Sequence, residues 1–438
     1  MTRRHFTLAL LSACCFAVEA HAAPTPDASW WAIFRSPTLD AVMRQAVSDN
    51  LDLAAAQATI AQADEAITVA RAGLRPRIDL TAQGGRQRMG GVSSNVYGIG
   101  PQVSFDFDLF GGTRSAIAQQ RAFADLQRHR FDAAWLTLTG DVAIQALQLA
   151  SARAQMAAVE DLLAQDRRLL TLTETAHDHG SATQVDIALA RSQLAQDETL
   201  LPPLAQQQDL ARHMLSVLAG RSPGDWTPPD VDLADLTLPA DLPDSLPSDL
   251  AHDRPDILEA EAQLHAASAG IGIATADLYP LLQLSAALGQ GAPGIATLWS
   301  IAAGLTAPIF HGGALKANQR AAVDGYQASL AGYKQTVVAS LGQVADALQA
   351  IRHDGQEEAA QQGALSAAET SQHLAEAGYR AGQNDMLTVL AAQRSRQRAL
   401  LGQIQARTAR YLDAVNLSVA LGGHARGAFE RQQSLATR

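Results

Sequence analysis

Short stretches of the chain alternate apolar and polar residues one by one, which is the pattern of a β-strand with one apolar and one polar face. The stretch SFDFDLFGG, from Ser104 to Gly112, alternates in this way until two glycines interrupt it. A first pair of strands is predicted at Arg77 to Gln83 and Tyr97 to Leu109. The same alternation predicts a second pair at Leu282 to Leu288 and Trp299 to Ile309.

Much longer stretches repeat their apolar residues every three or four positions, which predicts amphipathic helices. In the first half of the chain these helices cover Leu39 to Ala72, Arg114 to Thr175 and Gln184 to Ala219. In the second half they cover His252 to Ala276, Ala314 to Tyr379 and Met386 to Leu421. A helix of about 60 residues is roughly 90 Å long at ~1.5 Å per residue, which no compact domain needs. The pattern therefore indicates long antiparallel helices packed side by side.

This order of helix, strand pair and two long helices is written twice. The stretch LRPRIDL at Leu74 to Leu80 is echoed 204 residues later by LYPLLQL at Leu278 to Leu284. Phe110-Gly111-Gly112 is echoed by Phe310-His311-Gly312-Gly313, and Gly180 by Gly382. A chance match would not keep its order and nearly its offset over so long a stretch, so an internal duplication is predicted.

The duplication divides the chain into five predicted segments. Residues 1–22 form an export signal, residues 23–221 the first structural repeat and residues 248–423 the second. Residues 222–247 are a connection rich in proline and aspartate, and residues 424–438 are a polar C-terminal tail. The prolines of the connection forbid a continuous helix there.

The N-terminus allows two kinds of export signal. Arg3 and Arg4 precede an apolar run, and Ala20-His21-Ala22 offers a small-x-small cleavage site. Alternatively, Leu11-Ser12-Ala13-Cys14 resembles a bacterial lipobox, which would make residues 1–13 a lipoprotein signal and Cys14 the lipidated first residue. No later segment has about 18 uninterrupted apolar residues, so no transmembrane helix is predicted.

Composition excludes several classes of function. A formal net charge of -11 argues against nucleic acid as a partner. The chain contains no H-E-x-x-H or phosphate-binding loop, and no Cys/His pair. His177-Asp178-His179 lacks further metal ligands nearby in the sequence. We therefore expect neither an enzyme nor a bound cofactor or metal.

The strands leave two architectures open. A soluble sheet packed on a core is the commoner fate of alternating strands. However, four strands cannot close a barrel, so the edges of such a sheet stay open, and exported proteins cross the outer membrane only as closed barrels. Three chains that pool their strands would form a 12-stranded barrel with a lumen too wide for side chains to fill.

The order of these motifs resembles the TolC-type outer-membrane efflux factors, and within them the NodT/OprM-like branch. The resemblance rests on N-x-D-L at Asn50 to Leu53, the first hairpin, FDLFGG, the glycine turn, RPDI at Arg254 to Ile257, the second hairpin, and PIFHGG. It covers about residues 29 to 423. No single motif is decisive, but their order, written twice, is specific.

The resemblance implies a mainly α fold with a small transmembrane β part: a homotrimeric, internally duplicated channel-tunnel. Four strands and long antiparallel helices per protomer would form a 12-stranded barrel in the outer-membrane lipid and a helical cylinder across the periplasm. The implied function is the passive exit duct of a tripartite efflux system for drugs or other small molecules. The implied partners are a periplasmic adaptor (membrane fusion) protein and an inner-membrane pump.

Site residues follow from the strand pattern and from the resemblance. Phe105, Phe107, Trp299 and Ile301 are expected to face lipid, and Asp79, Asp106 and Asp108 the aqueous lumen. The turns between the long helices are expected to be the tips that meet the adaptor, through His177, His179, Gly180, Ser181, Tyr379, Arg380 and Gly382. The family's acidic entrance residue has no counterpart, because Ala391 stands in its place. Asp385 and Leu390 are the candidates left for the entrance.

Two other functions remain open on sequence grounds. An outer-membrane component of a type I-like protein secretion system would share the fold. A soluble periplasmic helical scaffold would pack the strands on its own helices. The RPDI segment and the short glycine- and serine-rich stretch at 88–95 favour drug-type efflux. The solute, the pump and the adaptor are not encoded in any motif.

Overall fold

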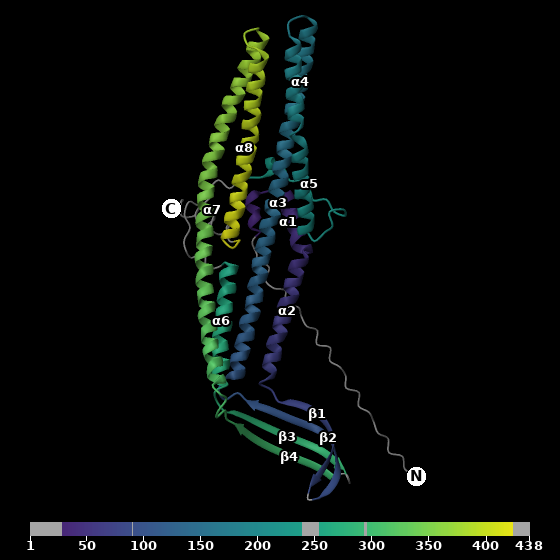
Figure 1. The fold of residues 1–438 in the computed structure, drawn as a ribbon, viewed down its shortest axis with the longest axis vertical. Coiled ribbons are helices and arrows are strands. Elements are labelled where there is room, and N and C mark those ends of the chain that lie inside the picture. The colour runs from purple at the N-terminus through teal and green to yellow at the C-terminus, as the bar shows by residue number, and fades with distance from the viewer. Residues whose placement is uncertain (1–28, 90, 239–253, 293–295, 424–438) are drawn as a thin grey trace, which may run out of the picture.

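A computed structural model describes residues 29–89, 91–238, 254–292 and 296–423, and it has the form of a long helical bundle with a β-sheet at one end (Figure 1). The first repeat contains η1 (Trp30–Phe34), α1 (Pro37–Asp49), α2 (Leu51–Ala72), β1 (Arg77–Met89), β2 (Val92–Phe107), α3 (Gly112–Asp178), α4 (Gln184–Glu198) and α5 (Leu201–Leu218). The rest contains η2 (Leu233–Asp235), α6 (Pro255–Ala276), β3 (Leu281–Ala292), β4 (Ala296–Thr306), α7 (Ala314–Arg380) and α8 (Met386–Ala420).

The predicted order of elements is confirmed, but two predicted helices are divided. The predicted helix at Leu39 to Ala72 breaks at Asn50, whose side-chain oxygen accepts a hydrogen bond from the amide of Leu53 (2.9 Å) and so begins a new helix. The predicted helix at Gln184 to Ala219 breaks after Glu198, because Pro202 and Pro203 have no amide hydrogen for the preceding turn.

The four strands form one antiparallel sheet in the order β1-β2-β3-β4. The strands are longer than predicted towards the hairpin tips, because glycines and small polar residues continue the pairing there. Strand β2 pairs with β3, so the two repeats meet inside the sheet. Within this single chain, β1 and β4 are the two edges of the sheet.

The largest hydrophobic core lies halfway along the bundle, where η1 and α1 pack against α3, α5 and α8. Its centre is formed by Trp30, Phe34 and Tyr411, all almost fully buried. The buried polar atoms of this core are paired: the Trp30 indole donates to Thr139 (3.1 Å) and the Tyr411 hydroxyl to the carbonyl of Leu236 (2.8 Å). This core holds the first repeat, η2 and α8 together.

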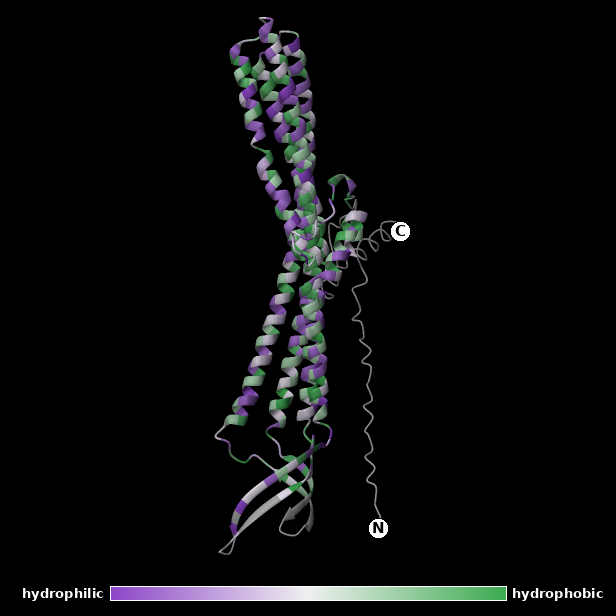
Figure 2. Cartoon of the chain, turned by 90° about the vertical axis from the view of Figure 1, so that its right-hand side faces the viewer, coloured by the Kyte–Doolittle hydropathy of each residue, from purple (hydrophilic) through white to green (hydrophobic). Residues whose placement is uncertain are grey.

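The helices beyond this core have mixed surfaces. Hydrophilic and hydrophobic residues alternate along the whole bundle, without a continuous apolar helix (Figure 2). Among the described helices, none has a stretch that is both long and apolar enough to cross a membrane.

Candidate functional site

The sheet has one apolar and one polar face over its whole width. The strand register places Val103 of β2 opposite Ile78 of β1 and Ala286 of β3, and Ala286 in turn opposite Ile301 of β4. Residues directly opposite each other in an antiparallel ladder share a face, so these four side chains form one apolar row. A similar apolar row runs through Phe105 and the residues opposite it on the neighbouring strands, and parallel rows lie on either side of it along the sheet. The apolar positions of all four strands are therefore aligned on one side.

The four residues expected to face lipid all lie on this apolar face. Phe105 and Phe107 are two positions apart on β2, and their rings make an edge contact with centroids 4.8 Å apart. Trp299 and Ile301, on β4, are 74% and 69% exposed. Trp299 and Ile301 are thus open to solvent in the described part of the single chain, although burial of such side chains is strongly favourable.

Asp79 and Asp106 lie on the opposite, polar face of the sheet. Asp106 is paired with Gln283 of β3, whose side-chain amide donates a 2.8 Å hydrogen bond to the Asp106 carboxylate. Asp79 is opposite Gln102, and Ser104 is opposite Ser285. This face therefore presents carboxylate, amide and hydroxyl groups.

The expectation for Asp108 is corrected by the structure. Strand β2 ends at Phe107, and Asp108 turns back to the start of α3, where its carboxylate accepts hydrogen bonds from the amides of Thr113 (2.9 Å) and Arg114 (3.1 Å). It also forms an ion pair with the Arg114 side chain (2.9 Å). Asp108 satisfies unpaired amides at a helix N-terminus, so it is not a residue of the strand face.

The junction between sheet and helices is built from both repeats. Phe110, which follows β2, stacks on Tyr279, which precedes β3, with ring centroids 4.6 Å apart and an angle of 13° between the planes. A cavity of about 460 Å³ lies beside this pair, between the end of the sheet and the first turns of α3 and α7, and it is lined in part by Asp106 and His311.

The turn that connects α3 to α4 lies at the end of the bundle opposite the sheet (Figure 1). Helix α3 ends at Asp178, and Gly180 takes a left-handed conformation (φ 76°) that reverses the chain. The ring of His177 forms a 2.9 Å hydrogen bond with the carbonyl of Ala182, and the Ser181 hydroxyl donates to the carbonyl of Ala176 (2.9 Å). His179 is exposed.

The second turn has the same construction at the end of α7. Gly382 has a φ of 72°, and Asp385 caps α8 by accepting from the amide of Thr388 (2.9 Å). Arg380 is exposed and forms an ion pair with Glu376 (3.4 Å). The two turns lie close together at this end of the bundle (Figure 1), so the structure gathers the predicted tip residues there.

Tyr379 connects the two turns. Its hydroxyl lies beside Thr173 of α3 and Asp186 of α4. Burial, and then the negative charge of Asp186, raise the pKa of Tyr379 above its usual value. Asp186 is also the last residue of the capping box on Thr183. The end of α7 therefore lies near the start of α4, a neighbourhood that the sequence did not predict.

The two entrance candidates have different surroundings. Asp385 is exposed but serves as the helix cap, and its hydrogen bonds with Thr388 hold the pKa of the carboxyl below its usual value. Leu390 is only 2% exposed, so it packs between helices and does not line an opening of the single chain. Ala391 is exposed on the next position of α8. The predicted role of Leu390 is corrected accordingly.

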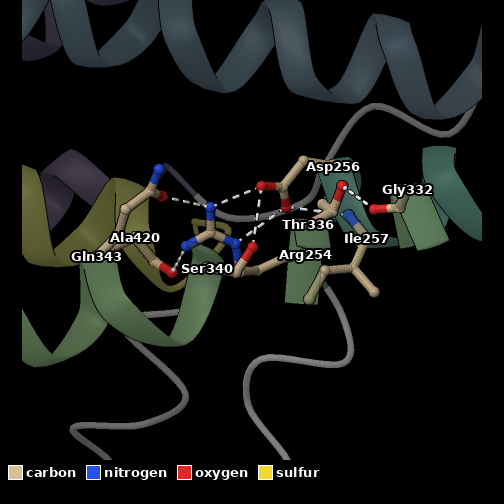
Figure 3. A network of polar contacts seen from close by, with 8 residues as sticks. All are labelled: Arg254, Asp256, Ile257, Gly332, Thr336, Ser340, Gln343 and Ala420. Carbon is tan, nitrogen blue, oxygen red and sulfur yellow. Dashed lines mark hydrogen bonds and ion pairs between the residues drawn. The ribbon is translucent and has the colours of Figure 1, made fainter. Parts of the chain in front are cut away.

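The RPDI segment forms a buried polar network at the start of α6 (Figure 3). Arg254 donates to both carboxylate oxygens of Asp256 (3.0 and 2.8 Å), to the carbonyl of Ala420 (2.7 Å) and to the side chain of Gln343 (2.7 Å). Asp256 also accepts from the hydroxyl of Ser340 (3.2 Å). One arginine therefore joins the start of α6, the middle of α7 and the end of α8 in the second repeat.

The remaining site predictions concern lipidation and metal binding. Cys14, the predicted lipidation residue, lies outside the described residues. Within the part of the chain that the structure describes, no group of three or more His, Cys, Asp or Glu side chains is placed to hold a metal ion.

Comparison with known proteins gives one consistent result. The family model described as "Outer membrane efflux protein" matches residues 42–221 and 246–423. The chain is 32% identical over 416 residues to the pyoverdine export outer membrane protein OpmQ of Pseudomonas putida, with 91% of this chain and 88% of that protein covered. It is 27% identical to nodulation protein T of Rhizobium leguminosarum bv. viciae, with 90% and 84% covered.

Solved structures agree with these relatives. The outer-membrane channel OprN superposes with a TM-score of 0.85 at 28% sequence identity, over 90% of this chain and 92% of that one. The open state of the Neisseria gonorrhoeae MtrE outer membrane channel superposes with a TM-score of 0.78 at 27% identity, over 91% and 92%.

Proposed function

The chain belongs to the outer membrane efflux protein family, and from that premise we propose that it is the trimeric exit duct through which a tripartite pump exports small molecules. As an outer-membrane efflux protein it resides in the outer membrane and extends into the periplasm. Beyond this location, we infer how the chain forms a duct, which residues contact lipid and water, and which class of solute passes.

The observation that carries the proposal is the sheet with one apolar face and two open edges. Three such sheets, joined edge to edge, give 12 strands with no unpaired edge. Trp299 and Ile301 would then meet lipid, and Asp106 would meet the aqueous lumen. The exposure of these apolar side chains in the single chain supports this assignment, because a soluble scaffold would cover them.

The helices supply the periplasmic part of the duct. Helices α3 and α7 each have 67 residues, which corresponds to roughly 100 Å at ~1.5 Å per residue. The turns at His179 and Gly382 therefore lie far from the membrane end, where an adaptor protein can reach them. Exposed Arg380 and His179 offer polar groups for that contact.

A small-molecule cargo is supported by the relatives. Their names refer to pyoverdine export and to the efflux of antibiotics and toluene. These solutes share little chemistry beyond small size, which fits a passive duct whose pump makes the selection. The chain is a channel and not an enzyme in this proposal, in agreement with relatives that are named as outer membrane efflux proteins.

Deletion of the gene provides the test. Cells that lack the chain should accumulate a fluorescent efflux dye and become sensitive to several unrelated small toxic compounds, while the secreted protein profile stays unchanged. Complementation should restore dye export. Loss of a secreted protein with normal dye export would instead indicate the protein secretion system.

A further inference from the structure

The stacked pair of Phe110 and Tyr279 closes the contact between the two repeats at the membrane end of the helices. Phe110 follows β2 and Tyr279 precedes β3, and these two strands pair with each other. The pair continues the pairing beyond the last ladder residues, Phe107 and Leu282. The pair therefore lies where the segment from β2 to α3 contacts the segment from α6 to β3.

The internal duplication assigns counterparts to both residues. Arg75 corresponds to Tyr279, and the backbone confirms this: the amides of Arg75 and Tyr279 donate 3.0 Å hydrogen bonds to Ala72 and Ala276, which are themselves 204 residues apart. Pro76 and Pro280 follow in each link. Phe310, in the link from β4 to α7, corresponds to Phe110 by the glycine pairs that follow both residues.

These counterparts cannot pair within one chain as Phe110 and Tyr279 do, because β1 and β4 are the two edges of the sheet. Phe310 is 86% exposed and its neighbour Ile309 90%, whereas Phe110 is 47% exposed. Arg75 is exposed as well. Two adjacent apolar side chains so open to solvent indicate a surface that another polypeptide covers.

We propose that Phe310 of one protomer stacks on the guanidinium group of Arg75 in a neighbouring copy. This contact would lie at the boundary between β4 of one copy and β1 of the next. The Phe110–Tyr279 stack lies at the corresponding boundary between β2 and β3 within one chain. The inference rests on the trimeric duct of the proposed function and adds the residues that join its protomers. It also follows the sheet, since the apolar faces of β4 and β1 lie on the same side.

The chemistry of the two pairs differs in one respect. An arginine side chain is planar and stacks on aromatic rings, with an added attraction between its charge and the ring face. The boundary between copies therefore contains a cation–π pair where the boundary within the chain contains two aromatic rings. Arg75→Glu should weaken assembly, whereas Arg75→Lys should weaken it less.

Cysteine cross-linking tests the contact directly. The repeats contain no cysteine, because the chain's two cysteines are Cys14 and Cys15, and Cys15→Ser leaves Cys14 as the one native cysteine of the sequence. In this background, Arg75→Cys with Phe310→Cys should give disulfide-linked dimers and trimers in isolated outer membranes. Phe110→Cys with Tyr279→Cys is the matched control, and its disulfide should form within one chain and leave a monomer on a non-reducing gel.

The outcomes separate this inference from the proposed function. Oligomers from the Arg75/Phe310 pair, and none from either single cysteine, would support the contact. A trimer by native mass measurement whose Arg75/Phe310 pair stays uncross-linked, while the control pair closes, would overturn the contact and leave the duct intact. A chain that stays monomeric in the membrane would overturn the contact and the trimeric duct together.

Discussion

Asp166 on α3 and Asp197 on α4 are two carboxyl groups buried against each other in the first helical hairpin. Asp197 accepts hydrogen bonds from Gln193 (2.7 Å) and Gln397 (3.4 Å). Neither carboxylate oxygen of Asp166 has such a partner among the described residues. Burial, and then the neighbouring Asp197, raise the pKa of Asp166 to about 7.

This pair predicts that stability falls as the pH rises. The folded chain keeps the Asp166 proton up to a pKa of about 7, whereas the unfolded chain releases it near 3.8. The stabilisation is therefore complete below the unfolded value and is lost as pH rises through the folded value. Asp166→Asn should raise the unfolding free energy, and with it the thermal midpoint, most at pH 8, by up to a few kcal/mol, by a smaller amount at pH 5, and hardly at all below the unfolded pKa of 3.8.

The measurement is helix content by circular dichroism during heating, at several pH values in detergent. Asp161→Asn is the control, because Asp161 is exposed one turn earlier on the same helix. Equal midpoints for Asp166→Asn and the parent at pH 8 would show that folding does not raise the pKa of Asp166.

A second carboxyl pair predicts an additive effect in the other repeat. Burial, and then Asp354 of α7, raise the pKa of Asp413 on α8 to about 7, although Arg410 opposes the shift. The sign is the same as for Asp166. Asp166→Asn combined with Asp413→Asn should flatten the pH dependence further than either change alone, because the two sites share no partner. Heating curves at pH 5 and pH 8 for the single and double variants decide the point.

The Arg254 network predicts a large cost for a conservative change. Arg254→Lys keeps the charge but removes the planar fork that reaches Asp256, Gln343 and the carbonyl of Ala420 at once. The Asp256 carboxylate, whose side chain is 39% exposed, would lose a two-point contact, and the carbonyl of Ala420 would lose a buried donor, at a cost of about 2 kcal/mol. Chemical denaturation of the detergent-solubilised protein measures this cost.

Arg128→Lys is the matched control for that experiment. Arg128 also contacts two carboxylates, Asp64 and Asp125, but its side chain is 44% exposed. Its change should cost no more than about 1 kcal/mol. Equal effects of the two substitutions would mean that the RPDI segment is no more important for stability than a surface ion pair.

The sheet faces predict opposite outcomes for two adjacent residues. Phe107→Asp places a charge on the apolar face, which is unfavourable in lipid, and it removes the ring contact with Phe105. Asp106→Asn keeps a polar group on the other face and can still accept from Gln283. After density-gradient fractionation, Phe107→Asp should be depleted from the outer membrane, and Asp106→Asn should be recovered like the parent. Normal insertion of both would contradict the assignment of the faces.

The sequence predicted the features that have a local period or a local motif. The faces of the strands were predictable because alternation has a period of two, and the turns because Gly180 and Gly382 each end a long helical pattern. The long helices were predictable from their length and spacing. The order of elements and the fold class therefore followed from sequence, with errors at element ends and at the helix breaks at Asn50 and after Glu198.

The rest depends on contacts between residues far apart in the chain. Asp108 continues the alternation of its strand, so no local signal separates a strand position from a helix cap. Arg254 contacts residues 89 and 166 positions away, and Tyr379 reaches the other hairpin. A buried aspartate such as Asp166 looks in sequence like any solvated position of a helix. Only the packing of the helices distinguishes these residues.

Tyr379 is predicted to stabilise both turns between the long helices. Tyr379→Phe removes the hydroxyl that lies beside Thr173 and Asp186 and keeps the ring. The ends of α3 and α7 should then open locally more often, because a half-buried polar contact is worth about 1 kcal/mol. Amide hydrogen exchange should become several-fold faster at both turns, including the turn at Gly180, which the substitution does not alter.

The control is Tyr326→Phe, on the same helix but more than 50 residues before Tyr379 in sequence. It should leave exchange at both turns unchanged. Faster exchange at Gly382 alone would show that Tyr379 stabilises only its own hairpin. Faster exchange at both turns would show that the Tyr379 hydroxyl couples the two hairpins.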